Sequence, residues 1–247
     1  MSKKVAYVTG GMGGIGTAIC QRLHKEGFKV IAGCGPTRDF NKWLDEQKAL
    51  GYTFYASVGN VGDWDSTVEA FTKAKAEHGP IDVLVNNAGI TKDRMFLKMS
   101  KEDWDAVIDT NLKTLFFLSQ AAAKGMISQG SGKIINIASM LTFQGGIRVP
   151  SYTASKSGVG GLTKAMANEW AAKGINVNAI APGYIETNNT AALQADENRN
   201  RQIVERIPAG RWGKAEDIGG AAVFLASSAA DYVNGHILAV DGGWLAR

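Results

Sequence analysis

The chain has 247 residues, enough for one large domain with a full hydrophobic core. Hydrophobic residues make up 45% of it and charged residues 20%, a profile typical of a globular protein. The formal net charge is +4, but the lysines and arginines form no block of like charge, so we do not expect a nucleic-acid-binding protein. The mild positive charge favours an anionic small-molecule ligand instead.

No part of the sequence predicts a membrane, a metal or an oxidising compartment. The apolar run near the start is too short for a signal peptide, and no run reaches 18 apolar residues, so we expect no membrane contact. Cys20 and Cys34 lie in apolar contexts without a C-x-x-C motif, which indicates buried free thiols in the cytoplasm. His24, His78 and His236 lack the spacing of metal ligands, so no metal site is expected.

Short β-branched runs alternate with helical patterns along the chain. The runs predict strands at Val5–Gly10, Lys29–Gly35, Phe54–Val61, Ile81–Gly89, Gly132–Ser139, Ile175–Gly183 and His236–Gly243. The helical patterns cover Ile15–Glu26, Phe40–Leu50, Trp64–His78, Trp104–Ile127, Tyr152–Ala172 and Ala215–Ser227.

This alternation predicts an α/β fold, in which a doubly wound sheet of seven parallel strands is covered by helices on both faces. No proline-rich linker divides the sequence, so we expect a single domain over residues 1–247. The polar and charged stretch 188–211 breaks the alternation, and we expect it to form a lid over a site.

The string TGGMGGIG stands between the first predicted strand and the first predicted helix. Backbone amides at a helix N-terminus favour an anion, and glycines let a pyrophosphate approach the backbone. Gly11, Gly13 and Gly16 fit the pattern G-x-G-x-x-G, whereas Gly10, Gly14 and Gly16 fit G-x-x-x-G-x-G. Both alignments predict a dinucleotide cofactor, and a glycine-rich turn without a ligand is the alternative.

The end of the second predicted strand indicates which dinucleotide is bound. An acidic residue there would bind the ribose diol of NAD(H), whereas an arginine would accept the 2′-phosphate of NADP(H). The strand ends in GCGPTRD, with no acid at its tip and Arg38 in the loop that follows. NADP(H) is therefore favoured. Asp39 could pair with Arg38 or face the ribose itself, so NAD(H) is also possible.

Tyr152 and Lys156 lie four residues apart in VPSYTASKSG, a spacing that places both on one face of a helix. A phenol titrates near ~10, and a neighbouring cation favours its ionised form. The pair could be a tuned proton donor, or a surface pair without a role.

Taken together, motifs along the whole chain resemble the short-chain dehydrogenases/reductases. The matching residues are Gly10, Gly14 and Gly16, then Asn86-Asn87-Ala88-Gly89, Asn111, Ser139, Tyr152, Lys156, Pro182-Gly183 and Asp241-Gly242-Gly243. The pair Asn60-Val61 departs from the family pattern, which more often has Asp-Val against the adenine. An amide oxygen can still accept a hydrogen bond from the adenine amine.

The resemblance implies a Rossmann-type fold and an NAD(P)-dependent oxidoreductase that interconverts a ketone and a secondary alcohol. It implies that Tyr152 protonates the carbonyl oxygen, that Lys156 lowers the pKa of this tyrosine and holds the nicotinamide ribose, that Ser139 orients the carbonyl, and that Asn111 holds a water. These roles agree with the chemistry of the reaction. Hydride addition to a ketone forms an alkoxide, so a hydrogen-bond donor must lie beside the carbonyl oxygen. Without catalysis, Ser139 would cap a strand end and Asn111 would sit at a helix bend.

The same resemblance implies a set of cofactor-binding residues spread over the carboxyl ends of the strands. They are Gly10, Gly14, Ile15, Gly16, Arg38, Asn60, Val61, Asn87, Gly89, Tyr152, Lys156, Pro182, Gly183, Ile185 and Thr187.

Within the family, the chain up to about Asn111 resembles bacterial acetoacetyl-CoA reductases, and the rest resembles 2-deoxy-D-gluconate 3-dehydrogenases. Family members bind substrate after Ser139 and Gly183, so the resemblance implies a keto-deoxy sugar acid as substrate. Reduction of a 3-oxoacyl-CoA is the alternative, and a non-catalytic nucleotide-sensing protein is an alternative of another class.

A sugar acid brings a carboxylate, which needs a fixed cation or several hydrogen-bond donors. Arg148 lies four residues before Tyr152 and could supply the cation, unless it is a surface residue or a subunit contact, and Asn188 and Asn189 could bind hydroxyls. Other candidate cations on the lid are Arg199, Arg201, Arg206 and Arg211.

The resemblance also implies a homotetramer. Two predicted helical stretches, Leu112–Ile127 and Ala154–Ala172, carry apolar residues on more than one face, which fits subunit contacts or core packing. Those residues include Phe116, Phe117, Leu162 and Trp170.

Overall fold

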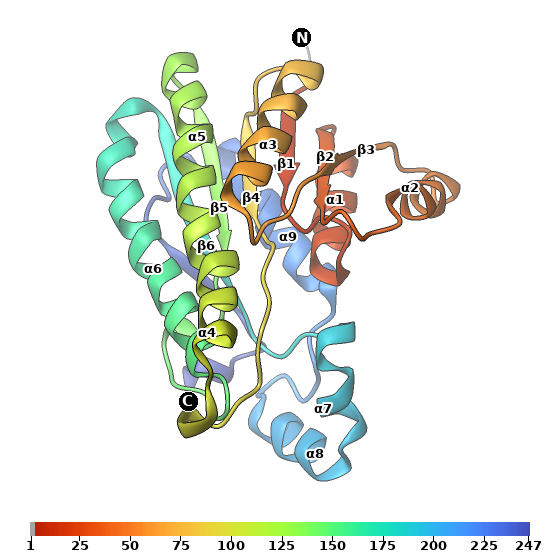
Figure 1. The fold of residues 1–247 in the computed structure, drawn as a ribbon, viewed down its shortest axis with the longest axis vertical. Helices are drawn as coiled ribbons and strands as arrows, with labels where there is room; N and C mark the ends of the chain where they lie inside the picture. Colours follow the sequence, from red (N-terminus) through yellow and green to blue (C-terminus); the bar gives the residue numbers. More distant parts are fainter. Residues whose placement is uncertain (1–2) are drawn as a thin grey trace.

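The computed structural model describes residues 3–247, and its centre is a sheet of seven parallel strands (Figure 1). The strand order is β3-β2-β1-β4-β5-β6-β7, so the chain moves outward from β1 first to one edge and then to the other. This confirms the predicted doubly wound α/β fold. The strands are β1 Val5–Val8, β2 Lys29–Cys34, β3 Phe54–Val58, β4 Val83–Asn86, β5 Gly132–Ile137, β6 Ile175–Pro182 and β7 Ile237–Val240.

The helices form a layer on each face of the sheet. Helices α1 and α9 pack together and against one face, whereas α3, α5 and α6 cover the other. The helices are α1 Gly14–Lys25, α2 Phe40–Ala49, α3 Trp64–His78, α4 Lys101–Ile108, α5 Thr114–Gln129, α6 Pro150–Trp170, α7 Ala191–Ala195, α8 Glu197–Arg206 and α9 Ala215–Ala226.

The central strands are buried on both faces because their side chains point alternately to the two helical layers. In β1, Ala6 and Val8 join the core beneath α1 and α9, whereas Val5 and Tyr7 join the core beneath α3 and α5. The strands of this sheet therefore have continuous runs of apolar residues, rather than apolar residues that alternate with polar ones.

The helix predicted over Trp104–Ile127 is interrupted. It begins earlier, at Lys101, where the Ser100 side chain accepts a hydrogen bond from the Asp103 amide and caps α4. A π-helical turn at Asp109–Lys113 then separates α4 from α5. Such turns widen the helix by one residue and often occur at functional positions.

The predicted lid stretch, 188–211, is largely helical. It holds a short 3-10 turn at Asn188–Thr190, then α7 and α8, which lie beyond the carboxyl edge of the sheet at the lower right of Figure 1. A third apolar cluster ties this segment to the body of the domain, through Met140, Ile203, Ile207, Trp212 and Trp244.

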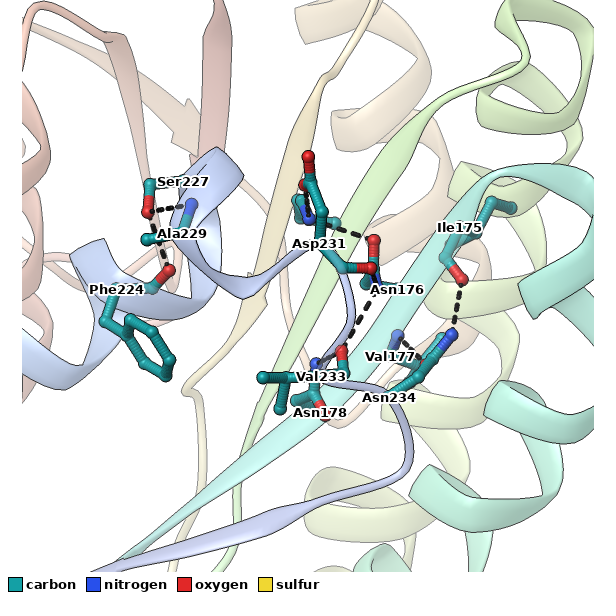
Figure 2. Close-up of polar contacts among 11 residues, drawn as sticks. Ile175, Asn176, Val177, Asn178, Phe224, Ser227, Ala229, Asp231, Val233 and Asn234 are labelled. Carbon is teal, nitrogen blue, oxygen red and sulfur yellow. Dashed lines mark hydrogen bonds and ion pairs between the residues drawn. The ribbon is translucent and has the colours of Figure 1, made fainter.

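At the opposite end of the sheet, three asparagines fix the edge strand β7 in place. The side chain of Asn176 donates to the carbonyls of Asp231 and Val233, at 2.9 and 3.0 Å. Asn234 accepts from the Val177 amide at 2.8 Å, and Asn178 donates to the Val233 carbonyl at 2.8 Å (Figure 2). These bonds hold the loop before β7 against the start of β6. Among the described residues, no helix is long and apolar enough to cross a membrane.

Candidate active site

The glycine-rich turn is closely packed, and its glycines are required by space. Gly10 has φ +60°, a conformation that favours glycine, and a Cβ there would stand 3.0 Å from the Ala88 Cα. A Cβ on Gly16 would collide with the Gly10 carbonyl oxygen, and one on Gly14 would stand 3.2 Å from the Thr187 methyl group. The turn therefore leaves only its backbone exposed toward a ligand.

The helix that follows this turn has no side-chain cap. Gly13 is the N-cap of α1 and no acidic residue lies in the first turn, whereas the side chains of Asp39 and Asp63 cap α2 and α3. The first amides of α1 are thus left for another acceptor, and a helix N-terminus attracts an anion. An uncapped helix behind a glycine cradle fits the pyrophosphate of a dinucleotide.

Arg38 lies against the glycine-rich turn, as expected of a residue that meets a 2′-phosphate. Its Nη2 donates to the Met12 carbonyl at 3.1 Å, and its charge partly offsets the rise in the pKa of the Cys34 thiol that burial causes. Asp39 forms no ion pair with Arg38, and its carboxylate instead caps α2, where Oδ1 accepts from the Lys42 amide at 3.0 Å.

A small cavity lies beside this turn. Gly33, Cys34, Ser57, Gly59 and Val61 are among its lining residues. Next to it, the Asn60 side-chain oxygen accepts from the Gly62 amide at 3.1 Å, so one lone pair of this oxygen is used within the loop. The second lone pair of this oxygen can accept another hydrogen bond, as the predicted contact with the adenine amine requires.

The end of β4 is clamped to the glycine-rich turn. The Asn87 side chain donates to the carbonyls of Thr9 and Gly10, both at 3.0 Å, and the Thr9 hydroxyl accepts from the amides of Asn87 and Ala88. Sequence motifs do not identify Thr9 as a site residue, because its partner Asn87 lies 78 positions later in the chain.

Lys156 is buried in the centre of the site. Its side chain is 4% exposed, and its Nζ donates to the Ile137 carbonyl at 2.6 Å. Burial penalises the charged form and lowers the pKa of Lys156 to about 8. The ammonium is therefore mostly protonated at neutral pH, with two further N–H groups to offer.

Tyr152 comes from the same helix, one turn earlier. The Lys156 Nζ lies 5.6 Å from the centre of its ring. Burial raises the pKa of Tyr152, and the Ser139 hydroxyl opposes this rise. The net shift of the Tyr152 pKa is upward because burial is the largest effect, and the lowering expected from Lys156 stays a prediction. The phenol is thus protonated at neutral pH.

Asn111 lies in the π-helical turn and is 1% exposed. Its Oδ1 accepts from the Ile90 amide at 2.8 Å, and its Nδ2 donates to the Ile90 carbonyl at 2.9 Å and to the Ser155 hydroxyl at 3.2 Å. The side chain therefore joins the loop after β4 to α6. A Cβ on Gly89 would stand 3.3 Å from the Asn111 Oδ1, a tight contact, and 3.7 Å from the Lys156 Nζ.

The segment after β6 closes the other side of the site. The Gly183 amide donates to the Val240 carbonyl at 3.0 Å, and a Cβ on Gly183 would stand 2.7 Å from the Asp241 Cα. Ile185 is buried, and Thr187 meets Gly14 across the site. The predicted cofactor residues after Pro182 thus lie beside the glycine-rich turn.

The predicted substrate residues are less well fixed. Arg148 is exposed and has φ +66°, the one positive φ at a non-glycine residue in the described chain. Asn188 and Asn189 are exposed at the start of the lid segment. All four candidate arginines on the lid already have partners. Arg211 pairs with Asp217 at 2.9 Å, and the Arg206 guanidinium stacks 4.0 Å from the Trp244 ring centre. Arg199 donates to Gln202 and Arg201 donates to Asn198, both at 3.3 Å.

Another cavity, of about 570 Å³, lies at the amino ends of the strands and is lined by residues such as Lys4, Asp82, Lys133 and Asp231. None of the predicted site residues within the described chain lines it, so it is separate from the carboxyl-end site.

Comparison with known proteins agrees with this geometry. The model of the family described as "short chain dehydrogenase" matches residues 4–198. A 2-dehydro-3-deoxy-D-gluconate 5-dehydrogenase from Escherichia coli is 54% identical over 247 residues, covering 99% of this chain and 96% of that protein. An acetoacetyl-CoA reductase from Cupriavidus necator is 49% identical, covering 98% of both chains.

Among solved structures, a protein from Agrobacterium tumefaciens with bound NADP superposes with a TM-score of 0.92 at 56% identity, covering 100% of this chain and 98% of that one. The family match spans most of the sequence, and both named relatives align over almost its full length. The chain therefore belongs to the short-chain dehydrogenase family, and it is an NAD(P)-dependent oxidoreductase that interconverts a ketone and a secondary alcohol.

Proposed function

We propose that Tyr152, Lys156, Ser139 and Asn111 carry out the reaction at the carboxyl ends of β4, β5 and β6. The observation that supports this most directly is the buried Lys156 ammonium one helical turn from a protonated Tyr152 phenol. When bound, the nicotinamide cofactor supplies or accepts the hydride. The Tyr152 hydroxyl then gives its proton to the alkoxide that forms on the carbonyl oxygen, and the Lys156 charge stabilises the tyrosinate left behind.

The two remaining residues have supporting roles. Ser139 lies at the end of β5 beside Tyr152, where its hydroxyl can donate to the substrate carbonyl and fix its orientation. Asn111 holds the Ile90 backbone and the Ser155 hydroxyl, which keeps the loop after β4 and helix α6 at a constant separation. A water held there could return the proton to Tyr152 by way of Lys156.

We propose NADP(H) as the preferred cofactor. Arg38 stands at the glycine-rich turn, where its guanidinium donates to the Met12 carbonyl, and Asp39, the acid nearest the end of β2, caps α2. The similar structure from Agrobacterium tumefaciens contains NADP. NAD(H) would lack the charge-assisted contact to Arg38 and would bind more weakly.

For the substrate we propose a keto-deoxy sugar acid. The relative from Escherichia coli acts on 2-dehydro-3-deoxy-D-gluconate according to its name, and Arg148 offers a cation on the wall between Ser139 and Tyr152. The left-handed backbone of Arg148 supports a functional role, because a long side chain takes that conformation at a cost of roughly 1–3 kcal/mol. Reduction of a 3-oxoacyl-CoA is the second candidate, favoured by the relative from Cupriavidus necator.

A panel of substrates tests this choice. Oxidation of NADPH is measured with 2-dehydro-3-deoxy sugar acids and with acetoacetyl-CoA, in the wild type and in Arg148→Leu. We expect the sugar acid to react faster, and we expect Arg148→Leu to raise its KM by roughly tenfold or more, the effect of losing one charge-assisted hydrogen bond. The activity toward acetoacetyl-CoA should change much less.

Tyr152→Phe is the control, because it should abolish turnover of every substrate while leaving cofactor binding nearly intact. Faster reduction of acetoacetyl-CoA than of all keto sugar acids would contradict the proposed substrate. Near-normal turnover by Tyr152→Phe would contradict the proposed catalytic roles, and a protein that binds NADPH but reduces nothing would be a nucleotide sensor.

We also propose a cytoplasmic homotetramer. Cys20 and Cys34 are both free and buried, which suits a reducing compartment. Trp104 and Phe116 leave 38% of their surfaces exposed on α4 and α5, where a second subunit could cover them.

A further inference from the structure

Thr142 makes contacts with the backbone of two of the proposed catalytic residues. Its Oγ1 donates to the Lys156 carbonyl at 2.9 Å and accepts from the Ser139 amide at 3.4 Å. Ser139 lies in the loop just after β5, whereas Lys156 lies in α6. One hydroxyl therefore joins the two elements that must bring Ser139, Tyr152 and Lys156 together.

Close packing supports these two hydrogen bonds. Thr142 closes the 3-10 turn Met140–Thr142, and its methyl group lies where a Cβ on Gly160 would come within 2.6 Å. The Ser157 hydroxyl also donates to the Leu141 carbonyl, at 3.4 Å. The turn thus rests directly on the face of α6.

The same turn determines how the Ser139 hydroxyl is directed. Ser139 Oγ accepts from the Leu141 amide at 3.1 Å, and the Thr142 amide donates to the Ser139 carbonyl at 2.9 Å. With its oxygen accepting from the turn, the Ser139 O–H proton is left to donate toward Tyr152 or the substrate carbonyl. The direction of that proton depends on the turn staying against α6.

We propose that Thr142 is a positioning residue, which acts through Ser139 by holding it in register with Tyr152 and Lys156. This inference rests on the proposed role of Ser139 in catalysis. The Thr142 hydroxyl bonds to the backbone of Ser139 and Lys156, and it makes no hydrogen bond with the Tyr152 side chain. Its removal should therefore slow the chemical step and leave cofactor binding unchanged.

The test uses Thr142→Val, which keeps the shape and removes the hydroxyl, and Thr142→Ser, which keeps the hydroxyl. We expect kcat to fall roughly tenfold in the valine variant, a change expected from one misplaced catalytic contact, and to return to within about threefold of wild type in the serine variant. The Kd for NADPH should stay the same in both. Thr142→Ala is a second variant without the hydroxyl, should the valine variant not fold.

Thr163→Val is the matched control. Thr163 lies in α6 and is fully buried. Its hydroxyl also joins β5 to α6, because it accepts from the Asn136 side chain at 2.9 Å and donates to the Val159 carbonyl at 2.8 Å. It is distant in sequence from Ser139 and touches no proposed catalytic residue. Thr163→Val should lower the melting temperature without changing kcat of the folded enzyme.

A double-mutant cycle with Ser139→Ala separates the possible outcomes. If Thr142 acts through Ser139, Thr142→Val should have little further effect in the Ser139→Ala background. An unchanged kcat in Thr142→Val, or a tenfold loss that persists without the Ser139 hydroxyl, would overturn the inference while the role of Ser139 stands. Wild-type activity in Ser139→Ala alone would instead remove the proposed role of Ser139, and the inference with it.

Discussion

Burial of Lys156 makes the stability of the folded protein depend on pH. In the folded protein its pKa is lowered to about 8 by burial, whereas in the unfolded chain it returns to the ordinary lysine value near 10.4. Below pH 8 both states hold the proton, and the folded state bears the full cost of a buried ammonium. Between the two pKa values the unfolded chain binds more protons, so this residue makes stability rise with pH.

We therefore expect the wild type to gain stability relative to Lys156→Met as the pH is raised from 8 to 10. The expected gain is at most about 1.4 kcal/mol per pH unit, the free-energy equivalent of one pKa unit. Urea unfolding of both proteins without cofactor, at pH 7, 8, 9 and 10, measures this difference. Parallel stability curves across this range would show that Lys156 keeps an ordinary pKa.

We expect Arg38 to determine the preference between NADPH and NADH. A charge-assisted hydrogen bond to a phosphate contributes about 1.5–3 kcal/mol, which corresponds to roughly tenfold or more in affinity. We expect Arg38→Ala to lower kcat/KM for NADPH by about that factor and to leave kcat/KM for NADH almost unchanged. If the ratio of the two values stays constant, the preference for NADPH arises from another residue.

The sequence located the proposed catalytic residues because each one belongs to a motif with a fixed place in the alternation of strands and helices. It could not give their environment. The direction of the Tyr152 pKa shift depends on burial by distant segments, and the role of Asp39 depends on where α2 begins. Thr9 and Thr142 act through hydrogen bonds to residues 78 and 14 positions away, which no local pattern reveals.

At the scale of the elements, the order of strands and helices could be predicted, since apolar runs in a fully buried parallel sheet are short and unmistakable. The ends of these strands and helices could not be predicted. Predicted strands ran into the turns that follow them, because the glycines and asparagines there, as at Gly10 and Asn87, are packed tightly against neighbouring strands. The π-helical turn is likewise a tertiary effect, since Asn111 is held there by the backbone of Ile90.

Several helices of the chain have a side-chain cap at the N-terminus, whereas α1 has none, as is also true of α6. Asp39, Asp63, Ser100 and Asp196 satisfy the amides of α2, α3, α4 and α8 with their own side chains. Helix α1 has only Gly13 at that position. Since an uncapped helix N-terminus is costly unless another acceptor is present, the sequence of α1 is best understood as adapted to a bound pyrophosphate.

At the scale of the whole molecule, one surface with exposed apolar side chains lies on helices α4 and α5. Trp104 and Phe116 are each 38% exposed on neighbouring helices α4 and α5, and Ile127 is 39% exposed near the end of α5. Phe117, on the same helix, contacts Trp64 with ring centres 4.6 Å apart. From the sequence, Phe116 and Phe117 could each pack in the core or contact another subunit. The exposure of Phe116 favours contact with another subunit.

We expect the protein to be a homotetramer in which this surface is buried. Light scattering at micromolar concentration should give about four times the mass of one chain, and Phe116→Glu should lower it, because a carboxylate cannot be buried without a partner. Tyr232→Glu is the control, since Tyr232 is fully exposed at the opposite end of the sheet and its replacement should leave the mass unchanged. A wild-type protein that is monomeric at this concentration would contradict the prediction, and a tetramer that survives Phe116→Glu would place the contact on another face.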